Sequence, residues 1–173
     1  MDIKPTPFAS DAPLGSRRAI IRCNPANIHE IEMIEASWGS NPRFSDGVSY
    51  RFVRAEGQNL SDSRCLVPVS QFHLRAGNEL YRVTLANGDH FYLAGIWEPA
   101  MGDWPVSYRV ITVPANPEVA RYQERHGAIV HRQEVMRWLD PTVDPAELLK
   151  TPPARTFIVD HISGGAQQPA LAL

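Results

Sequence analysis

Apolar and polar residues alternate in the middle of the chain, on either side of a short polar segment. Residues 80–85 (LYRVTL) alternate along their whole length, and residues 90–96 (HFYLAGI) alternate in part. Because successive side chains of a strand point to opposite faces, this alternation predicts strands with one buried face. Residues 86–89 (ANGD) lie between them and contain Asn-Gly, the strongest short hairpin signal. We therefore expect the two strands to pair as a hairpin.

Three further segments are short and apolar, and they are rich in β-branched side chains. Residues 18–23 (RAIIRC), 64–69 (RCLVPV) and 108–113 (YRVITV) predict strands. Residues 28–38 (IHEIEMIEASW) fit neither the strand period nor the helix period cleanly. Both a strand and a helix remain open for this segment.

Helix signals begin at Asn116. This residue is an N-cap candidate, and it is followed by a proline at the first helical position and an acid in the first turn. The pattern predicts a helix over residues 117–126 that stops at Gly127, a suitable C′ residue. Residues 132–139 (RQEVMRWL) predict a second short amphipathic helix, and residues 144–147 (DPAE) predict the start of a third.

The order of the elements indicates the fold class. Strands precede the helices instead of alternating with them, which favours a single α+β domain over a parallel α/β sheet. Residues 155–159 (RTFIV) predict one closing strand. Residues 1–15 have the composition of an extended arm, and residues 163–173, rich in Gly, Gln and Ala, predict a disordered tail. The expected domain covers residues 1–162.

Composition narrows the class of protein further. Hydrophobic residues make up 43% and charged residues 21%, as in a soluble globular domain. The formal net charge is −2, so nucleic-acid contact would need a local cluster of arginines. Arginine far outnumbers lysine, which is compatible with phosphate binding but also results from a G+C-rich genome. No signal peptide, membrane span, metal-ligand cluster or cofactor motif is evident, and we expect a cytoplasmic protein without cofactor or metal.

Several segments match a known set of motifs in order and spacing. The matching segments are residues 54–56 (RAE), 64–68 (RCLVP), 93–98 (LAGIWE), 111–116 (ITVPAN) and 123–125 (QER). They are similar, in turn, to Asn-Ala-Arg-x-Glu, Arg-Cys-Leu-Ile-Pro, Phe-Ala-Gly-Leu-Trp-Glu, Thr-Thr-x-Ala-Asn and His-Asp-Arg-Met-Pro. Trp38-Gly39 and Pro42 resemble a further Trp-Gly-x-x-Pro motif. Together the segments resemble the SOS response-associated peptidase (SRAP) family.

The resemblance implies a fold and a reaction. The fold is a mostly antiparallel β pseudo-barrel with flanking short helices. In the reaction, removal of the initiator Met exposes an N-terminal Cys, which attacks the aldehyde of an abasic site in single-stranded DNA and forms a thiazolidine cross-link. A Glu and a His transfer protons, and an Asn positions groups. Thiazolidine closure needs a thiolate and an α-amine on one residue, and Schiff-base steps need acid–base groups within hydrogen-bond reach.

This sequence departs from the family at three positions. Position 2 is Asp2 instead of Cys, and Cys23, an internal residue without a free α-amine, cannot replace it. The family's His falls on Gln123, whose amide cannot shuttle a proton. His126 is either a partial substitute or a histidine at a helix C-terminus. The family's Asn falls on Phe52, which is either a core aromatic or a base-stacking residue.

Other family positions are retained. Glu98 matches the catalytic Glu, with an ordinary exposed carboxylate as the alternative, and Arg54 matches an arginine near the DNA backbone. The candidate catalytic positions are therefore Glu98, Gln123 and Phe52. The candidate DNA-binding residues are Arg54, Arg51, Thr112, Trp38, Arg64 and Arg125.

Three functions compete on this basis. The first is an SRAP-like protein that binds single-stranded or abasic-site DNA in the DNA damage response, with its cross-linking activity lost. The second is a non-catalytic scaffold or partner-binding module that retains the fold without DNA binding. The third, a residual hydrolase, lacks any Ser/His/Asp or Cys/His constellation with suitable spacing.

Overall fold

The protein is described by a computed structural model, which covers residues 3–57, 59–60 and 62–162. The expected tail and Asp2 lie outside these residues. The strands are β1 (Thr6–Ala9), β2 (Arg17–Asn24), β3 (Asn27–Trp38), β4 (Phe52–Arg54), β5 (Arg64–Ala76), β6 (Glu79–Leu85), β7 (Phe91–Glu98), β8 (Ser107–Pro114), β9 (Arg125–Gly127), β10 (Ile129–Val130) and β11 (Phe157–His161). The helices are η1 (Pro42–Phe44), α1 (Pro117–Ala120), η2 (Arg132–Glu134), α2 (Val135–Leu139) and η3 (Pro145–Glu147).

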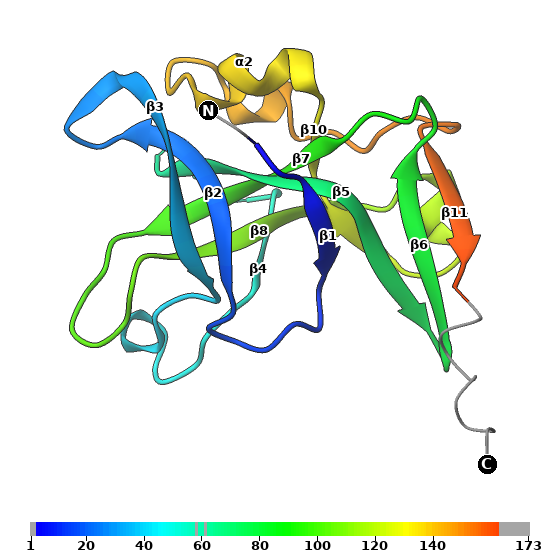
Figure 1. Ribbon diagram of the computed structural model, residues 1–173, viewed down its shortest axis with the longest axis horizontal. Helices are drawn as coiled ribbons and strands as arrows, with labels where there is room; N and C mark the ends of the chain where they lie inside the picture. Colours follow the sequence, from blue (N-terminus) through cyan, green and yellow to red (C-terminus); the bar gives the residue numbers. More distant parts are fainter. Residues whose placement is uncertain (1–2, 58, 61, 163–173) are drawn as a thin grey trace.

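A ring of strands forms the centre of the molecule (Figure 1). Pairing runs from β5 to β2, β3, β8 and β7, and β7 pairs again with β5. The remaining strands attach to this ring, and α2 packs against its outside. Most pairings are antiparallel; the parallel ones are β1–β5, β3–β8 and β4–β8. The expected α+β pseudo-barrel with few short helices is confirmed.

The central strands are buried on both faces, which explains their continuous apolar sequences. Val67 and Val110 belong to one hydrophobic cluster, and their neighbours Leu66 and Ile111 belong to another. Since adjacent side chains point to opposite faces, each strand contributes to both clusters. Trp138 of α2 completes the second cluster and is fully buried.

The hairpin expected at residues 86–89 is wrong. The turn itself forms, with Gly88 at φ 83° and its N–H bonded to the Leu85 carbonyl at 3.0 Å. However, β6 pairs with the second half of β5, and β7 pairs with the first half. A strand of 13 residues has room for both partners, so the turn joins strands that do not pair with each other. The tight hairpin is β5–β6, around Gly77.

Three other expectations are resolved by pairing. The ambiguous segment 28–38 is a strand, because it pairs with β2 along most of its length. The helix expected over 117–126 ends at Ala120, since residues 125–127 pair with β8 as β9. Within the expected arm, β1 pairs in parallel with β5. The other expected strands and the N-cap at Asn116 are confirmed.

Candidate functional site

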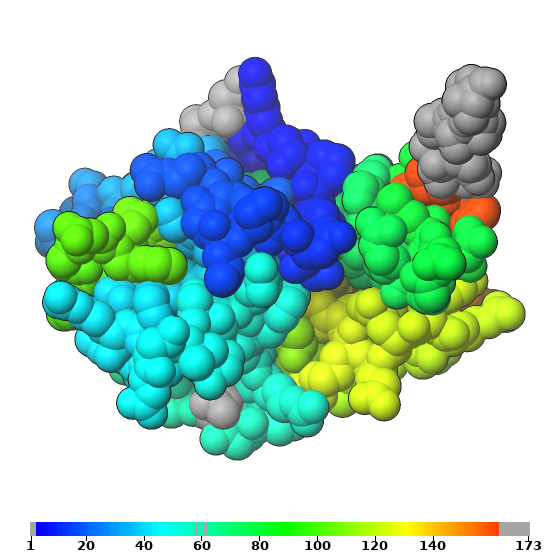
Figure 2. Space-filling model, turned by 90° about the horizontal axis from the view of Figure 1, so that it is seen from below, coloured from blue at the N-terminus to red at the C-terminus, as the bar shows by residue number. Residues whose placement is uncertain are grey.

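A pocket with a volume of about 450 Å³ opens where segments far apart in the sequence meet. Figure 2 shows the face on which the N-terminal segment, the segment around residues 40–60 and the segment after α1 surround a hollow. The pocket is lined by Phe8 of β1, Phe52 and Arg54 of β4, Thr112 of β8, and Gln123 beside β9. Ligand pockets typically have volumes of about 300–1,000 Å³, so the hollow is large enough for a small organic group.

The parallel pairing of β4 with β8 places two of these side chains. Phe52 pairs with Val110, and Arg54 pairs with Thr112. Val53, between them, packs into the hydrophobic core. Because alternate side chains share a face, Phe52 and Arg54 both project outward into the pocket.

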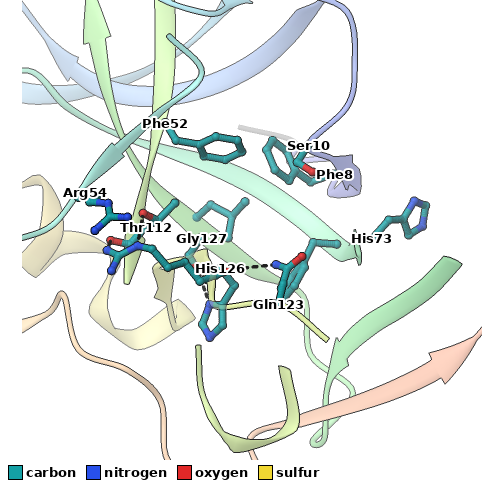
Figure 3. Close-up of a pocket in the computed structure, with 12 residues that line it drawn as sticks. Phe8, Ser10, Phe52, Arg54, His73, Thr112, Gln123, His126 and Gly127 are labelled. Atoms are coloured by element: carbon teal, nitrogen blue, oxygen red, sulfur yellow. Dashed lines mark hydrogen bonds between the residues drawn. The ribbon is translucent and has the colours of Figure 1, made fainter. Parts of the chain in front are cut away.

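One side of the pocket is aromatic. Phe8 and Phe52 lie beside each other in Figure 3. Each packs edge to face on buried Trp38, with ring centroids 5.4 Å apart in both pairs. Phe72 of β5 adds a third ring, 5.6 Å from Phe157. Such edge-to-face contacts hold the rings in defined orientations. Phe8 and Phe72 are almost completely buried, whereas Phe52 is 36% exposed, so Phe52 is the ring that is available to a ligand.

The opposite side is polar and ordered by Arg125. Its guanidinium forms two hydrogen bonds with the Glu56 carboxylate, at 2.8 and 2.7 Å. It also donates to the hydroxyl and carbonyl oxygens of Thr112, at 3.0 and 2.7 Å. The hydrogen bond from Arg125 lowers the pKa of Glu56 to about 2, so the pair is ionised at neutral pH. Arg54 lies beside it, exposed and, among the described residues, without an ion pair.

Gln123 and His126 lie on the third side (Figure 3). The Gln123 amide donates to the Arg125 carbonyl at 2.7 Å, which leaves its oxygen and second N–H for other partners. His126 is 3% exposed; its Nε2 accepts from the Asn116 N–H, and its Nδ1 donates to the Gly127 carbonyl at 2.8 Å. Burial lowers its pKa, so the ring is neutral. Both nitrogens are occupied, so His126 is a structural histidine in β9, and neither role expected for it is realised.

The pocket brings together Phe52, Gln123, Arg54, Thr112 and Arg125 of the residues singled out from the sequence. The other four lie elsewhere, and each has a structural reason for its place.

Glu98 lies outside this pocket. It lines a separate cavity with Phe44, and its Oε1 is 3.6 Å from the Arg109 guanidinium. Arg51 precedes Phe52 on the alternating segment and is half-buried on the other face. Trp38 is 1% exposed and supports the two phenylalanine rings from behind. Its contribution to the pocket is therefore indirect.

Arg64 is buried, and its guanidinium holds the chain after α2. It donates to the carbonyls of Leu60, Trp138, Asp140 and Val143 at 3.1, 3.1, 2.9 and 2.6 Å. Burial lowers its pKa, while the nearby carboxylates of Asp140 and Asp144 act in the opposite direction. Four hydrogen bonds to the backbone make this side chain a structural clamp. The expected contact of Arg64 with DNA has no exposed donor to make it.

The cysteines do not contribute to the pocket. Cys23 donates weakly to the Leu139 carbonyl at 3.4 Å, and burial raises the pKa of its thiol. Cys65 is fully buried in the core. A thiol with a raised pKa is a poor nucleophile. Over the described ranges, no three His, Cys, Asp or Glu side chains are grouped as a metal would require. In the same part of the chain, no helix combines the length and apolar composition needed to cross a membrane.

Sequence reasoning missed Phe8, Phe72 and His73, which also line the pocket. Phe8 is the only aromatic residue in the N-terminal 15 residues. This single aromatic side chain was the available signal that the arm packs onto the domain.

Comparisons with known proteins extend these observations. The family model described as SOS response associated peptidase (SRAP) matches residues 15–164. Among solved structures, a protein from Bordetella bronchiseptica is similar, with a TM-score of 0.71 and 20% identity over 92% of this chain and 91% of that one. A protein from Bacteroides thetaiotaomicron has a TM-score of 0.65 and 20% identity over 86% of this chain and 74% of that one. No curated protein sequence matches significantly.

Proposed function

Since the chain belongs to the SRAP family, we propose that it binds single-stranded DNA, intact or abasic, at the pocket between Phe52 and Arg54, as part of a response to DNA damage. One observation carries the proposal: family-matched positions distant in sequence line a single pocket. A pocket with an aromatic side and a cationic mouth fits single-stranded DNA, because exposed bases stack on aromatic rings and phosphates attract arginine.

The same pocket favours non-covalent binding over cross-linking. Gln123 stands where the family has a proton-transferring histidine, and its amide does not titrate. Phe52 stands where the family has an asparagine, and its ring offers no hydrogen bond. Two histidines line the pocket. His126 is neutral and has both nitrogens occupied. His73 has its Nε2 in a hydrogen bond with the Gln71 amide at 2.7 Å, and burial lowers its pKa. At the two positions where the family has a histidine and an asparagine, the side chains thus bind and position a ligand without supplying the acid–base steps of Schiff-base chemistry.

Binding is tested by fluorescence anisotropy with a labelled single-stranded oligonucleotide, its abasic counterpart and the matching duplex. We expect both single strands to bind more tightly than the duplex. The logarithm of the binding constant should fall linearly with the logarithm of salt concentration, by about 0.7 per phosphate contacted. Arg54→Gln should weaken binding and reduce that slope, whereas Arg43→Gln, an exposed arginine outside the pocket, should change neither. A flat titration with every DNA would reject DNA binding and favour the scaffold function.

Cross-linking is tested separately. The protein is incubated with abasic single-stranded DNA and analysed by denaturing gel electrophoresis, after its intact mass has established the N-terminal residue. We expect no adduct that survives denaturation. A stable adduct would refute the loss of covalent activity while leaving DNA binding intact.

A further inference from the structure

An exposed stripe of side chains leads along the chain into the pocket. Residues 50–56 alternate strictly between exposed and half-buried positions, and Tyr50, Phe52 and Arg54 are on the exposed side. Tyr50 is 50% exposed and Phe52 is 36% exposed, which is unusual for large aromatic side chains. Residues two apart on an extended segment are about 6.6 Å apart. Two aromatic rings followed by a cation therefore stand at regular intervals on one surface.

The aromatic side of the pocket is built for a flat apolar group. Phe52 and Phe8 stand next to each other against Trp38, and Phe72 lines the pocket from β5. A deoxyribose without its base is a polar group with no flat face, and it gains little from the exposed ring of Phe52. A nucleobase has a π-face that stacks on aromatic side chains irrespective of its identity.

The polar side of the pocket complements the edge of a base. The free amide oxygen and N–H of Gln123 provide an acceptor and a donor side by side. The Thr112 hydroxyl accepts from Arg125 and retains its own proton to donate. Paired donors and acceptors of this kind are what base edges present and bind. The Glu56–Arg125 pair is internally neutral, so Arg54 supplies the net positive charge for a neighbouring phosphate.

We propose that the pocket holds an intact, unstacked nucleobase of single-stranded DNA in preference to a base-less sugar. Phe52 stacks on this base, and Tyr50 stacks on the adjacent one. Arg54, on the other side of Phe52, contacts the phosphate on the far side of the nucleotide in the pocket. The inference rests on the proposed DNA binding and goes beyond it by naming which part of the strand enters the pocket. In this protein, the pocket of a fold that recognises lesions would thus bind an undamaged base.

The experiment compares short oligonucleotides of equal phosphate number. One consists entirely of tetrahydrofuran abasic nucleotides, and the other has a single central thymine restored, so that only one base is available for the pocket. We expect the restored base to raise affinity on the order of tenfold, the usual effect of one base–aromatic stack. With 2-aminopurine in place of thymine, its fluorescence should be quenched on binding.

Substitutions assign the effect to the pocket. Phe52→Leu keeps the apolar volume against Trp38 and should remove most of the tenfold gain and the quenching. Phe44→Leu is the matched control: Phe44 is 58% exposed but lines the separate cavity of Glu98, so the gain should persist. Arg54→Gln should lower the affinity for both oligonucleotides by the same factor.

The outcomes separate the two proposals. Equal affinity for both oligonucleotides, or tighter binding of the fully abasic one, overturns the base-binding inference while DNA binding stands. A gain that persists in Phe52→Leu overturns it as well. If neither of these oligonucleotides binds, and an ordinary single strand with all its bases does not bind either, the proposed DNA binding is rejected.

Discussion

Replacing Arg64 by methionine should destabilise the fold strongly without touching the pocket. The side chain donates four hydrogen bonds to carbonyls, and its guanidinium lies 5.0 Å from the centroid of the Trp138 ring. Each hydrogen bond from a charged group is worth about 1.5–3 kcal/mol. The values do not add, because the 140–143 turn is exposed in part and its carbonyls can reach water. A buried carbonyl left without its donor costs about 1–3 kcal/mol, and with part of this turn open to water we expect a total loss of about 3–5 kcal/mol.

The assay is urea unfolding followed by tryptophan fluorescence, together with thermal melting. For a domain of this size, a loss of about 4 kcal/mol lowers Tm by roughly 8–16 °C. Arg54→Met is the control, because an exposed arginine should change stability by only about 0.5 kcal/mol. Under conditions where both variants are folded, Arg64→Met should bind DNA like the parent chain. A stability loss below about 1 kcal/mol, or weaker DNA binding by the folded variant, would show that Arg64 is not a structural clamp.

Three other substitutions test the packing and electrostatics of the site. Gly95→Ala should cost about 1–3 kcal/mol of unfolding free energy, measured in urea, because the added Cβ would lie 2.8 Å from the Arg109 carbonyl oxygen. The pKa of His126 is lowered in the folded state, so its contribution to stability is present above the ordinary pKa of 6.5 and is lost as pH falls below it. In urea titrations, the free energy of unfolding should therefore differ less between pH 7 and pH 5.5 in His126→Gln than in the parent chain. An equal difference in the two proteins would contradict this. Glu56→Gln removes the carboxylate paired with Arg125 at the pocket mouth, so single-stranded DNA affinity should rise severalfold in anisotropy titrations, and a fall would contradict the assigned charge of the mouth.

Local sequence patterns predicted most strands because the side chains of these strands pack against apolar surroundings. The runs at 64–69 and 108–113 are buried on two faces, so their sequences are apolar regardless of partner, and in the run at 18–23 the two buried residues are Ile20 and Ile21. Errors arose where the partner determines the outcome. Residues 125–127 carry no strand signal of their own, and they are a strand because β8 has a free edge there.

The residues of the candidate site divide in a similar way into those that local motifs identify and those that only the fold brings in. Phe52, Arg54, Thr112 and Gln123 were found by motif spacing, and the fold brings them together. Phe8 could not be found in this way, because a residue far from the motifs enters the pocket through the parallel pairing of β1 with β5. Arg64 was expected to bind DNA, but it is buried, because a sequence shows the charge of a residue and not its exposure.

The sequence alone determined the β-rich α+β class, the family resemblance and the presence of a non-titrating amide at Gln123, because these depend on residue type and local periodicity. Only the tertiary structure decided that Arg64 and His126 are structural, that Glu98 lies apart, and that Phe8 meets Phe52 over Trp38. The reason is that burial and hydrogen-bond partners are properties of segments distant along the chain. Those non-local contacts bring arginines and aromatic residues from distant segments together in one pocket, where Arg54 is the exposed cation.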